Sequence, residues 1–322
     1  MPRAGLGQRR RGQLLAQLRA IRRLLTIPAR AASSPVAPLD MPSTHDPRAI
    51  FVVGSPRSGT SVLAWALAQH EDLATGPEMD VTYFLAKLIG QAEPAPDTPL
   101  RKLEAVEHAL QVSLRREDGW LAKLDVSRAE VLAAMGQGLN ELFSRTLGGK
   151  RWIDSTPACA MTCPQLAGLF PEASFLHIVR DGRAAVSSMI HSGFDVRIAK
   201  DFDFACETWA SFVKHAHAFC EAEPGRALEL RQEDMARDPE GVMERVLPFL
   251  DCQLDEAVPA FLRKGRINSS WGNEKEGDVA RQKDHSVVPK TPWREWSRGR
   301  KRSFRKLAGE VQEAMGYPLD LD

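Results

Sequence analysis

A loop rich in glycine and serine follows the first strongly apolar run of the chain. It reads Gly-Ser-Pro-Arg-Ser-Gly-Thr-Ser over residues 54–61, after the apolar run 49–53 and before a helical pattern over 61–68. The order of strand, glycine loop and helix directs backbone N–H groups at an anion. Loops that hold the phosphates of ATP or GTP end in Gly-Lys-Ser/Thr, whereas here Thr60 replaces the lysine and the cation is Arg57. The pattern therefore predicts a site for a phosphate-bearing donor other than ATP or GTP.

A second candidate anion site follows another apolar run. Arg180-Asp181-Gly182-Arg183 comes directly after the run 174–179, and Ser188 lies further along the helical pattern that this turn opens. An arginine at the carboxyl end of a strand lies beside a helix N-terminus, where α/β sheets bind ligands, and its guanidinium binds phosphate in a bidentate way. The alternative is that Arg180 and Asp181 pair with each other or cap the helix. Two such sites on one sheet predict a donor with phosphates at two places.

The elements that must position these loops alternate between strands and helices. Short strands are predicted at 49–53, 151–154, 174–179 and 227–230. Helices are predicted between and around them, at 61–68, 78–91, 99–116, 127–147, 165–170, 182–191, 202–221, 240–250, 256–263 and 302–315. A continuous apolar strand is typical of a parallel sheet that is covered on both faces. We therefore predict an α/β fold, a three-layer sandwich with a central parallel sheet.

Charge is distributed unevenly along the chain. The 322 residues carry a net charge of +1, but eight arginines precede Asp40, the first acidic residue, and the remainder holds 35 basic against 42 acidic residues. We therefore expect no nucleic-acid binding by the body of the protein, so that any anion site is local. Residues 1–48 are predicted to be a basic tail and linker, and residues 49–322 a single domain.

The tail segment 13–25 combines apolar residues at helical spacing with a basic face. It fits a helix at a membrane surface or on a partner, an organelle transit peptide, or a partly helical or disordered tail. No apolar run approaches the ~18 residues of a membrane helix. The five scattered cysteines include no C-x-x-C pair, which fits a reducing compartment and predicts neither a disulfide nor a zinc site. We expect a cytoplasmic protein without a metal, with the tail as its candidate peripheral membrane contact.

The two loops with their flanking segments resemble the motifs of the sulfotransferase superfamily. The resemblance rests on residues 51–61 and 175–190, with weaker matches at 233–235 and 315–317. It covers about residues 49–317 and is nearest to the tyrosylprotein sulfotransferase-like branch and its bacterial relatives. It implies a P-loop NTPase-like sulfotransferase fold and 3′-phosphoadenosine 5′-phosphosulfate as the donor. The implied reaction moves a sulfuryl group to a hydroxyl of a carbohydrate, lipid, peptide or small-molecule acceptor.

The resemblance also implies roles for individual residues. The first loop would bind the 5′-phosphosulfate, and Arg180 and Ser188 the 3′-phosphate, so that the candidate donor-binding residues are Ser55, Arg57, Ser58, Gly59, Thr60, Ser61, Arg180 and Ser188. The tyrosylprotein branch has a glutamate at a fixed distance after the loop arginine, where Glu78 stands here. Glu78 would then be the general base, and Arg57 would stabilise charge at the phosphosulfate bridge. The alternatives are that Glu78 is only an acidic residue in a helix first turn, or that His70 or His191 is the base.

Two positions depart from the family pattern. Ser155 stands where the family often has a lysine that bridges the leaving phosphate, and Gln232 stands where a tyrosine is usual. Lys290 or another cation in the segment 265–300 is a candidate substitute for that lysine. Residues 266–271 and 283–296 are candidates for a lid over the nucleotide, the alternative being an exposed polar loop. The other functional hypotheses are a nucleotide kinase-like phosphoryl transferase and a nonenzymatic nucleotide-binding scaffold, which Ser155 favours.

Overall fold

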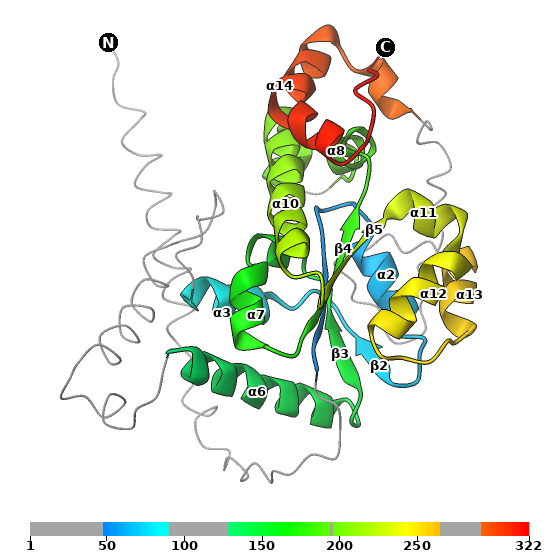
Figure 1. Cartoon of the computed structure of the whole chain (residues 1–322). Coiled ribbons are helices and arrows are strands. Elements are labelled where there is room, and N and C mark those ends of the chain that lie inside the picture. The colour runs from blue at the N-terminus through cyan, green and yellow to red at the C-terminus, as the bar shows by residue number, and fades with distance from the viewer. Residues whose placement is uncertain (1–47, 90–127, 194–195, 265–290, 322) are drawn as a thin grey trace, which may run out of the picture. The chain divides into compact units, whose positions relative to one another are not determined.

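A five-stranded sheet forms the centre of the computed structural model, which describes residues 48–89, 128–193, 196–264 and 291–321. The strand order is β2-β3-β1-β4-β5, and every neighbouring pair is parallel. The strands are β1 (Ile50–Val53), β2 (Leu73–Thr75), β3 (Arg151–Asp154), β4 (Ser174–Val179) and β5 (Ala227–Arg231). The predicted parallel sheet is confirmed (Figure 1). The edge strand β2 was not predicted, because three residues are too few to show a strand period.

The middle of the sheet is fully covered on both faces. All four residues of β1 are at most 1% exposed, and they pair with β4 in the register Ile50–Ser174 to Val53–His177. The ring of Phe51 stacks on Phe175 with centroids 5.2 Å apart and meets Trp152 edge-on at 5.5 Å. Burial on both faces explains why β1 and β4 are apolar without alternation.

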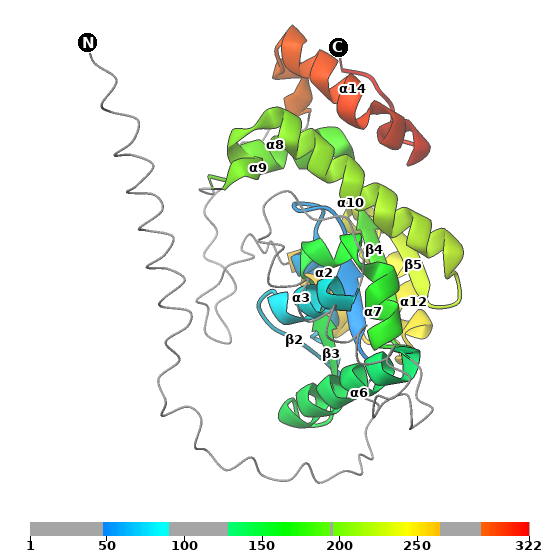
Figure 2. The same cartoon turned by 90° about the vertical axis from the view of Figure 1, so that its left-hand side faces the viewer.

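Helices cover both faces of the sheet and complete the three-layer sandwich (Figures 1 and 2). One face carries α2 (Thr60–Leu67), α12 (Pro239–Phe249) and α13 (Ala257–Lys264), which share a core with Ile50, Val52 and Ile178. The other face carries α3 (Asp80–Ile89), α7 (Cys163–Leu169) and α10 (Phe202–Ala222), with α6 (Arg128–Thr146) packed near α7. The short elements are η3 (Pro157–Met161), α9 (Arg197–Lys200), α11 (Gln232–Arg237) and η4 (Pro292–Glu295).

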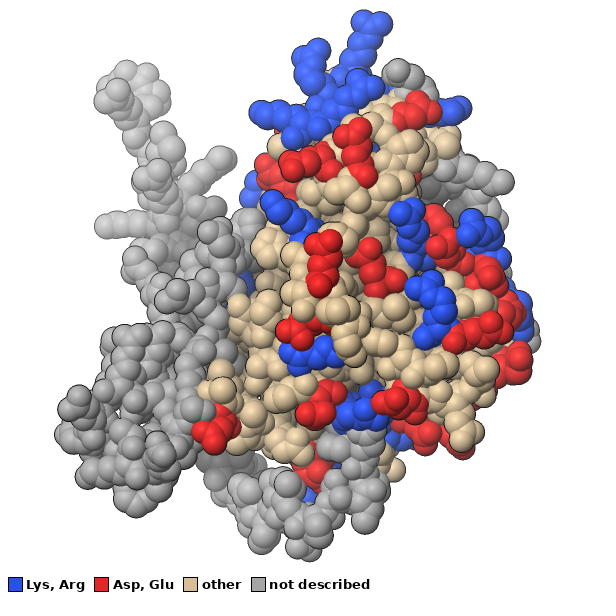
Figure 3. All heavy atoms as spheres, in the orientation of Figure 1, with Lys and Arg blue, Asp and Glu red and all other residues tan. Residues whose placement is uncertain are grey.

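A third core lies beyond the carboxyl edge of the sheet, where α8 (Gly182–Ile190), α10 and α14 (Arg298–Ala314) meet around Trp209 and Phe304. The helix α14 begins four residues earlier than predicted, because Ser297 caps it by accepting a hydrogen bond from Arg300 N at 3.3 Å. Its first turns are strongly basic, and Figure 3 shows basic side chains gathered there, namely Arg298, Arg300, Lys301, Arg302, Arg305 and Lys306.

Part of the predicted nucleotide lid belongs to this third core. Trp293 and Trp296 are only 8% and 7% exposed, and the Trp296 ring lies 4.9 Å from that of Phe202. The alternative of an exposed loop is therefore wrong for Trp293 and Trp296, whose side chains are used for packing, and the lid stays a prediction. The predictions for the tail 1–47, the helix 99–116 and the segment 265–290, including Lys290, lie outside the described residues. Within the described ranges, no helix is long and apolar enough to cross a membrane.

Candidate functional site

The two predicted anion loops leave the sheet from neighbouring strands. From the end of β1 the chain continues through α2 to β2, and from the end of β4 it continues through α8 and α10 to β5. These connections run to opposite halves of the sheet and cover opposite faces. The carboxyl ends of β1 and β4 therefore form a topological switch point, the position at which open α/β sheets bind ligands.

The first loop has the backbone geometry of an anion nest. Ser58 N donates to Ser55 O at 3.1 Å, and both Arg57 and Gly59 are left-handed, with φ of 67° and 101°. A Cβ added at Gly54 would lie 2.5 Å from Ile178 O, so only glycine lets the loop run this close to β4. Successive residues of alternating handedness turn their N–H groups towards one point. Non-glycine residues in this strained left-handed conformation, such as Arg57, occur mostly at functional sites.

The start of α2 is left without a protein cap. Gly59, its N-cap, makes no side-chain cap hydrogen bond, and the first turn holds no acidic residue. Neither the N-cap residue nor the first turn of α2 therefore neutralises the positive end of the helix dipole. Among the predicted loop residues, Arg57 and Ser61 are partly exposed, whereas the side chains of Ser55, Ser58 and Thr60 are buried.

The two loops contact each other directly. Arg57 Nε donates to Ser188 Oγ at 3.1 Å, and Arg180 Nη1 donates to Arg57 O at 2.9 Å. Burial lowers the pKa of Arg57, and the charge of Arg180 lowers that pKa further. Burial also lowers the pKa of Arg180, although Glu233 and Asp181 oppose the shift. Burial disfavours the charged forms of both guanidinium groups, and the neighbouring like charge adds to this at Arg57. A bound anion between them is therefore favourable, because its negative charge stabilises both charged forms.

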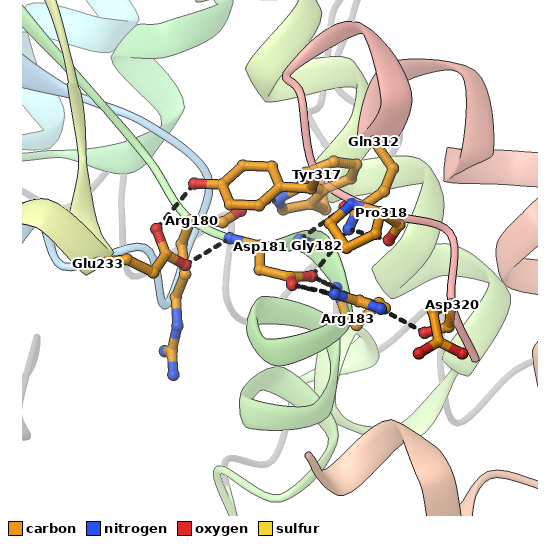
Figure 4. Close-up of polar contacts among 10 residues, drawn as sticks. Arg180, Asp181, Gly182, Arg183, Glu233, Gln312, Tyr317, Pro318 and Asp320 are labelled. Carbon is orange, nitrogen blue, oxygen red and sulfur yellow. Dashed lines mark hydrogen bonds and ion pairs between the residues drawn. The ribbon is translucent and has the colours of Figure 1, made fainter. Parts of the chain in front are cut away.

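The turn between β4 and α8 differs from the first loop in an important way. Asp181 caps α8 by accepting from Arg183 N at 2.9 Å, and it pairs with Arg183 Nη2 at 2.6 Å rather than with Arg180. Asp181 N donates to Glu233 Oε1 and Gly182 N donates to Gln312 Oε1, each at 2.9 Å (Figure 4). The N-terminus of α8 is therefore capped by protein side chains, as the helix-cap alternative predicted, and these side chains already accept from its first N–H groups. The predicted anion-binding groups that remain are the Arg180 guanidinium at this turn and the Ser188 hydroxyl, further along α8.

Glu78 lies in the connection between β2 and α3, partly buried, at the same carboxyl edge of the sheet. The next residue is fixed to the end of β3, since Met79 N donates to Thr156 Oγ1 at 2.8 Å. The buried Asp154 carboxylate in turn accepts from Thr156 N at 2.8 Å and from Thr82 Oγ1. Because α3 begins at Asp80, Glu78 precedes the helix, so the alternative of a first-turn acidic residue is not supported.

The histidine alternatives for the base have other roles. His70 is 4% exposed, its Nδ1 accepts from Asp72 N at 3.2 Å, and its Nε2 lies 3.2 Å from Gln253 O. Both ring nitrogens are therefore used within the protein, which leaves no lone pair for an acceptor proton. His191 ends α8, at the opposite end of that helix from Arg180, and its Nδ1 lies 2.7 Å from Ser187 O.

Several residues at the site were not predicted as functional. The sequence pattern did not mark Gln312 or Asp154 as site residues, since a helical or strand pattern does not distinguish a buried polar residue from an exposed one. Glu233 and Tyr317 were noted only as weak motif matches, yet Tyr317 OH donates to Glu233 Oε2 at 2.8 Å. A separate hollow of about 590 Å³ between α7 and α10 contains none of the candidate site residues.

Comparison with known proteins identifies the family. A family model described as "Sulfotransferase family" matches residues 47–256, a range that contains both loops and all five strands. The chain belongs to the sulfotransferase family. The resemblance predicted from the two motifs, and the fold that it implied, are confirmed.

Similar proteins are found in animals and bacteria. Protein-tyrosine sulfotransferase 1 of Danio rerio is 25% identical over 246 residues, which cover 74% of this chain and 62% of the relative. Nodulation protein NoeE of Sinorhizobium fredii (strain NBRC 101917 / NGR234) is 32% identical over 143 residues, 44% of this chain and 31% of the relative. The chain thus spans less than two thirds of the length of these relatives.

A solved structure agrees with the fold. The sulfotransferase domain from the Synechococcus PCC 7002 olefin synthase matches with a TM-score of 0.52 at 20% sequence identity. The match covers 86% of this chain and 98% of that domain. The likeness extends beyond the range of the family model and therefore includes part of the C-terminal region.

Proposed function

We propose that this sulfotransferase moves the sulfuryl group of 3′-phosphoadenosine 5′-phosphosulfate to a hydroxyl group of an acceptor. The observation that carries the proposal is the junction of the two loops, where Arg180 binds the backbone of Arg57 and Arg57 binds Ser188. This junction joins the uncapped start of α2 to a second cationic group. A nucleotide with phosphate groups at both the 5′ and the 3′ position of its ribose can place one group at the start of α2 and the other at Arg180.

The residues present fit this donor, and each has a proposed role. Gly54 lets the loop run close to β4, Gly59 adopts the left-handed conformation before α2, and the N–H groups at the start of α2 bind the 5′-phosphosulfate. The hydroxyls of Ser55, Ser58, Thr60 and Ser61 belong to the same loop. Arg180 and Ser188 bind the 3′-phosphate. Arg57 lies between the two positions and stabilises the negative charge that develops on the bridging oxygen as the bond to sulfur breaks.

Glu78 is the proposed general base. Its carboxylate takes the proton of the acceptor hydroxyl while that oxygen forms a bond to sulfur, and the bridging oxygen leaves on 3′-phosphoadenosine 5′-phosphate. The connection that carries Glu78 is held against β3 through the Met79–Thr156 hydrogen bond. Ser155 occupies the family's lysine position and can donate one hydrogen bond but carries no positive charge. In this proposal Arg57 therefore supplies more of the charge stabilisation at the bridging oxygen than in relatives with the lysine.

A binding experiment tests the donor assignment. Calorimetry with 3′-phosphoadenosine 5′-phosphate is expected to detect binding to the wild-type protein and a loss of about tenfold or more in affinity for Arg180→Ala. Absence of binding, or binding that Arg180→Ala leaves unchanged, would overturn the assignment. Transfer of labelled sulfate to a panel of hydroxyl acceptors follows, and it begins with tyrosine peptides because some relatives are protein-tyrosine sulfotransferases.

The competing functions are less favoured. Family membership and the missing loop lysine disfavour a kinase-like phosphoryl transferase, and the arrangement around Glu78 disfavours a scaffold without catalysis. We propose a cytoplasmic location, which the five free cysteines support, and a peripheral membrane contact through the basic tail. Sedimentation with anionic vesicles, compared for the full chain and a chain lacking residues 1–47, tests the membrane contact.

A further inference from the structure

The C-terminal segment of the chain contacts the turn that carries Arg180. Gln312 Oε1 accepts from Gly182 N at 2.9 Å, and Gln312 Nε2 donates to Asp181 Oδ1 at 2.9 Å. Five residues later, Tyr317 OH donates to Glu233 Oε2 at 2.8 Å, and Figure 4 shows Gln312 pointing at the start of α8 and the Tyr317 hydroxyl pointing at Glu233. The contacts join the end of α14, the start of α11 and the turn after β4.

These contacts fix the peptide group that follows Arg180. Trp209 Nε1 donates to Arg180 O at 3.2 Å, and the next N–H group, that of Asp181, donates to Glu233 Oε1 at 2.9 Å. Tyr317 holds the second oxygen of the same Glu233 carboxylate. The direction in which the Arg180 side chain leaves the turn therefore depends on Tyr317 through Glu233, and on Gln312 through Asp181 and Gly182.

The segment is anchored well enough to act as a rigid support. Gln312 is 0% and Tyr317 7% exposed. Arg231 Nη2 donates to Met315 O at 2.6 Å, and its guanidinium lies 4.7 Å from the centre of the Tyr317 ring. A buried polar contact that is fully satisfied holds its partners in one geometry, because breaking it leaves a buried group without a hydrogen bond.

We propose that Gln312 and Tyr317 are positioning residues of the donor site, which hold Arg180 in the orientation that binds the 3′-phosphate. The inference rests on the proposed function, since it assumes that Arg180 binds this phosphate. It extends the donor site beyond residue 256, where the match to the family model ends. Positioning of this kind affects recognition of one phosphate group rather than of the whole nucleotide.

The test compares two ligands that differ by that phosphate. Calorimetry measures 3′-phosphoadenosine 5′-phosphate and adenosine 5′-phosphate against Tyr317→Phe and Gln312→Met. Each variant removes hydrogen bonds at nearly constant side-chain volume, and each is expected to weaken binding of the first ligand about fivefold to tenfold. Binding of adenosine 5′-phosphate is expected to stay within about twofold, and in turnover assays the KM for the donor rises more than kcat falls.

Two controls separate positioning from general loss of stability. Tyr83→Phe makes the same chemical change at the only other tyrosine of the chain, and it should change neither affinity. Phe304→Leu alters a fully buried residue of α14 that packs in the third core. It should lower the melting temperature without changing the ratio of the two affinities. A change in that ratio for Phe304→Leu equal to the change for Tyr317→Phe would overturn the inference.

The outcomes also separate this inference from the proposed function. Arg180→Ala must lose the preference for the ligand with the 3′-phosphate, and if it does not, the donor assignment itself is wrong. If Arg180→Ala loses the preference while Tyr317→Phe keeps it, the positioning role of Tyr317 is wrong and the donor assignment stands. If Gln312→Met does not fold, Tyr317→Phe alone decides, because it leaves the ring and its packing in place.

Discussion

Arg57 Nε donates a hydrogen bond to Ser188 Oγ at 3.1 Å, which links two motifs that lie 131 residues apart in the sequence. The bond joins the loop after β1 to the helix α8 after β4, and its donor is a left-handed arginine with φ of 67°. Arg180 binds the carbonyl of the same residue. Arg57 is therefore the residue through which the two halves of the proposed donor site are joined.

The first prediction concerns the strain at Arg57. Arg57→Gly removes the cation but suits the left-handed backbone, so we expect kcat to fall about 10²–10³-fold while the free energy of unfolding is unchanged or rises by about 1 kcal/mol. The reason is that the left-handed conformation costs energy for any residue with a Cβ. Turnover with labelled donor and thermal unfolding of the free protein measure the two effects.

Arg57→Ala is the matched comparison for this prediction. It removes the same cation but keeps a Cβ in the left-handed conformation, so it should lose the same activity and be less stable than Arg57→Gly. Equal stability of the two variants would show that the backbone at this position relaxes when the side chain is removed.

The second prediction concerns Glu78 as the base. Glu78→Gln keeps the size of the side chain but cannot take the acceptor proton, so we expect kcat to fall about 10²-fold or more with unchanged affinity for 3′-phosphoadenosine 5′-phosphate. Glu71→Gln is the control, since Glu71 is exposed in the turn before β2, at the other end of that strand. Turnover that survives in Glu78→Gln at the wild-type rate would exclude this residue as the base.

The limits of sequence reasoning are clear from particular residues at this site. The meeting of Arg57 and Arg180 could be predicted, because the carboxyl ends of parallel strands share one edge of the sheet. The capping of α8 could not, because Gly182 N binds Gln312, which lies 130 residues further along the chain. The pattern of α14 identifies Gln312 only as one position of an amphipathic helix. The burial of Trp293 and Trp296 could not be predicted for the same reason, since their partners Arg183 and Phe202 are distant in sequence.

The third prediction tests the packing of α6 against the end of α7. A Cβ at Gly136 would lie 1.7 Å from Leu169 O, whereas a Cβ at Gly138 would meet no atom within 4 Å. Gly136→Ala should therefore lower the free energy of unfolding by several kcal/mol, because backbone must move. Gly138→Ala, two residues later in the same helix, should raise it by about 0.5–1 kcal/mol through helix propensity. Chemical denaturation of both variants measures the contrast, and similar effects at the two positions would contradict the packing described for Gly136.

The fourth prediction concerns Glu229 of the edge strand β5, whose carboxylate contacts two histidines. Glu229 Oε2 lies 3.0 Å from Nδ1 of the fully buried His177 and 2.8 Å from Nδ1 of His217. Burial alone would raise the pKa of Glu229, but the hydrogen bonds and charges of the two histidines outweigh it and hold the pKa at about 2. Burial lowers the pKa of His177, and the hydrogen bond and charge of Glu229 oppose that shift.

The sign of the pH dependence follows from that lowered pKa. A carboxyl group with a lowered folded-state pKa stabilises the protein at pH values above its unfolded value of about 4.3, and the stabilisation is lost as the pH falls towards 2. Glu229→Gln should therefore cost about 1–3 kcal/mol at pH 7, as expected for hydrogen bonds to a charged group, and the difference from wild type should shrink as the pH falls below about 4. Unfolding of both proteins in urea between pH 3 and pH 7 measures it. A difference that stays constant over this range would show that the ionised carboxylate is not what His177 and His217 bind.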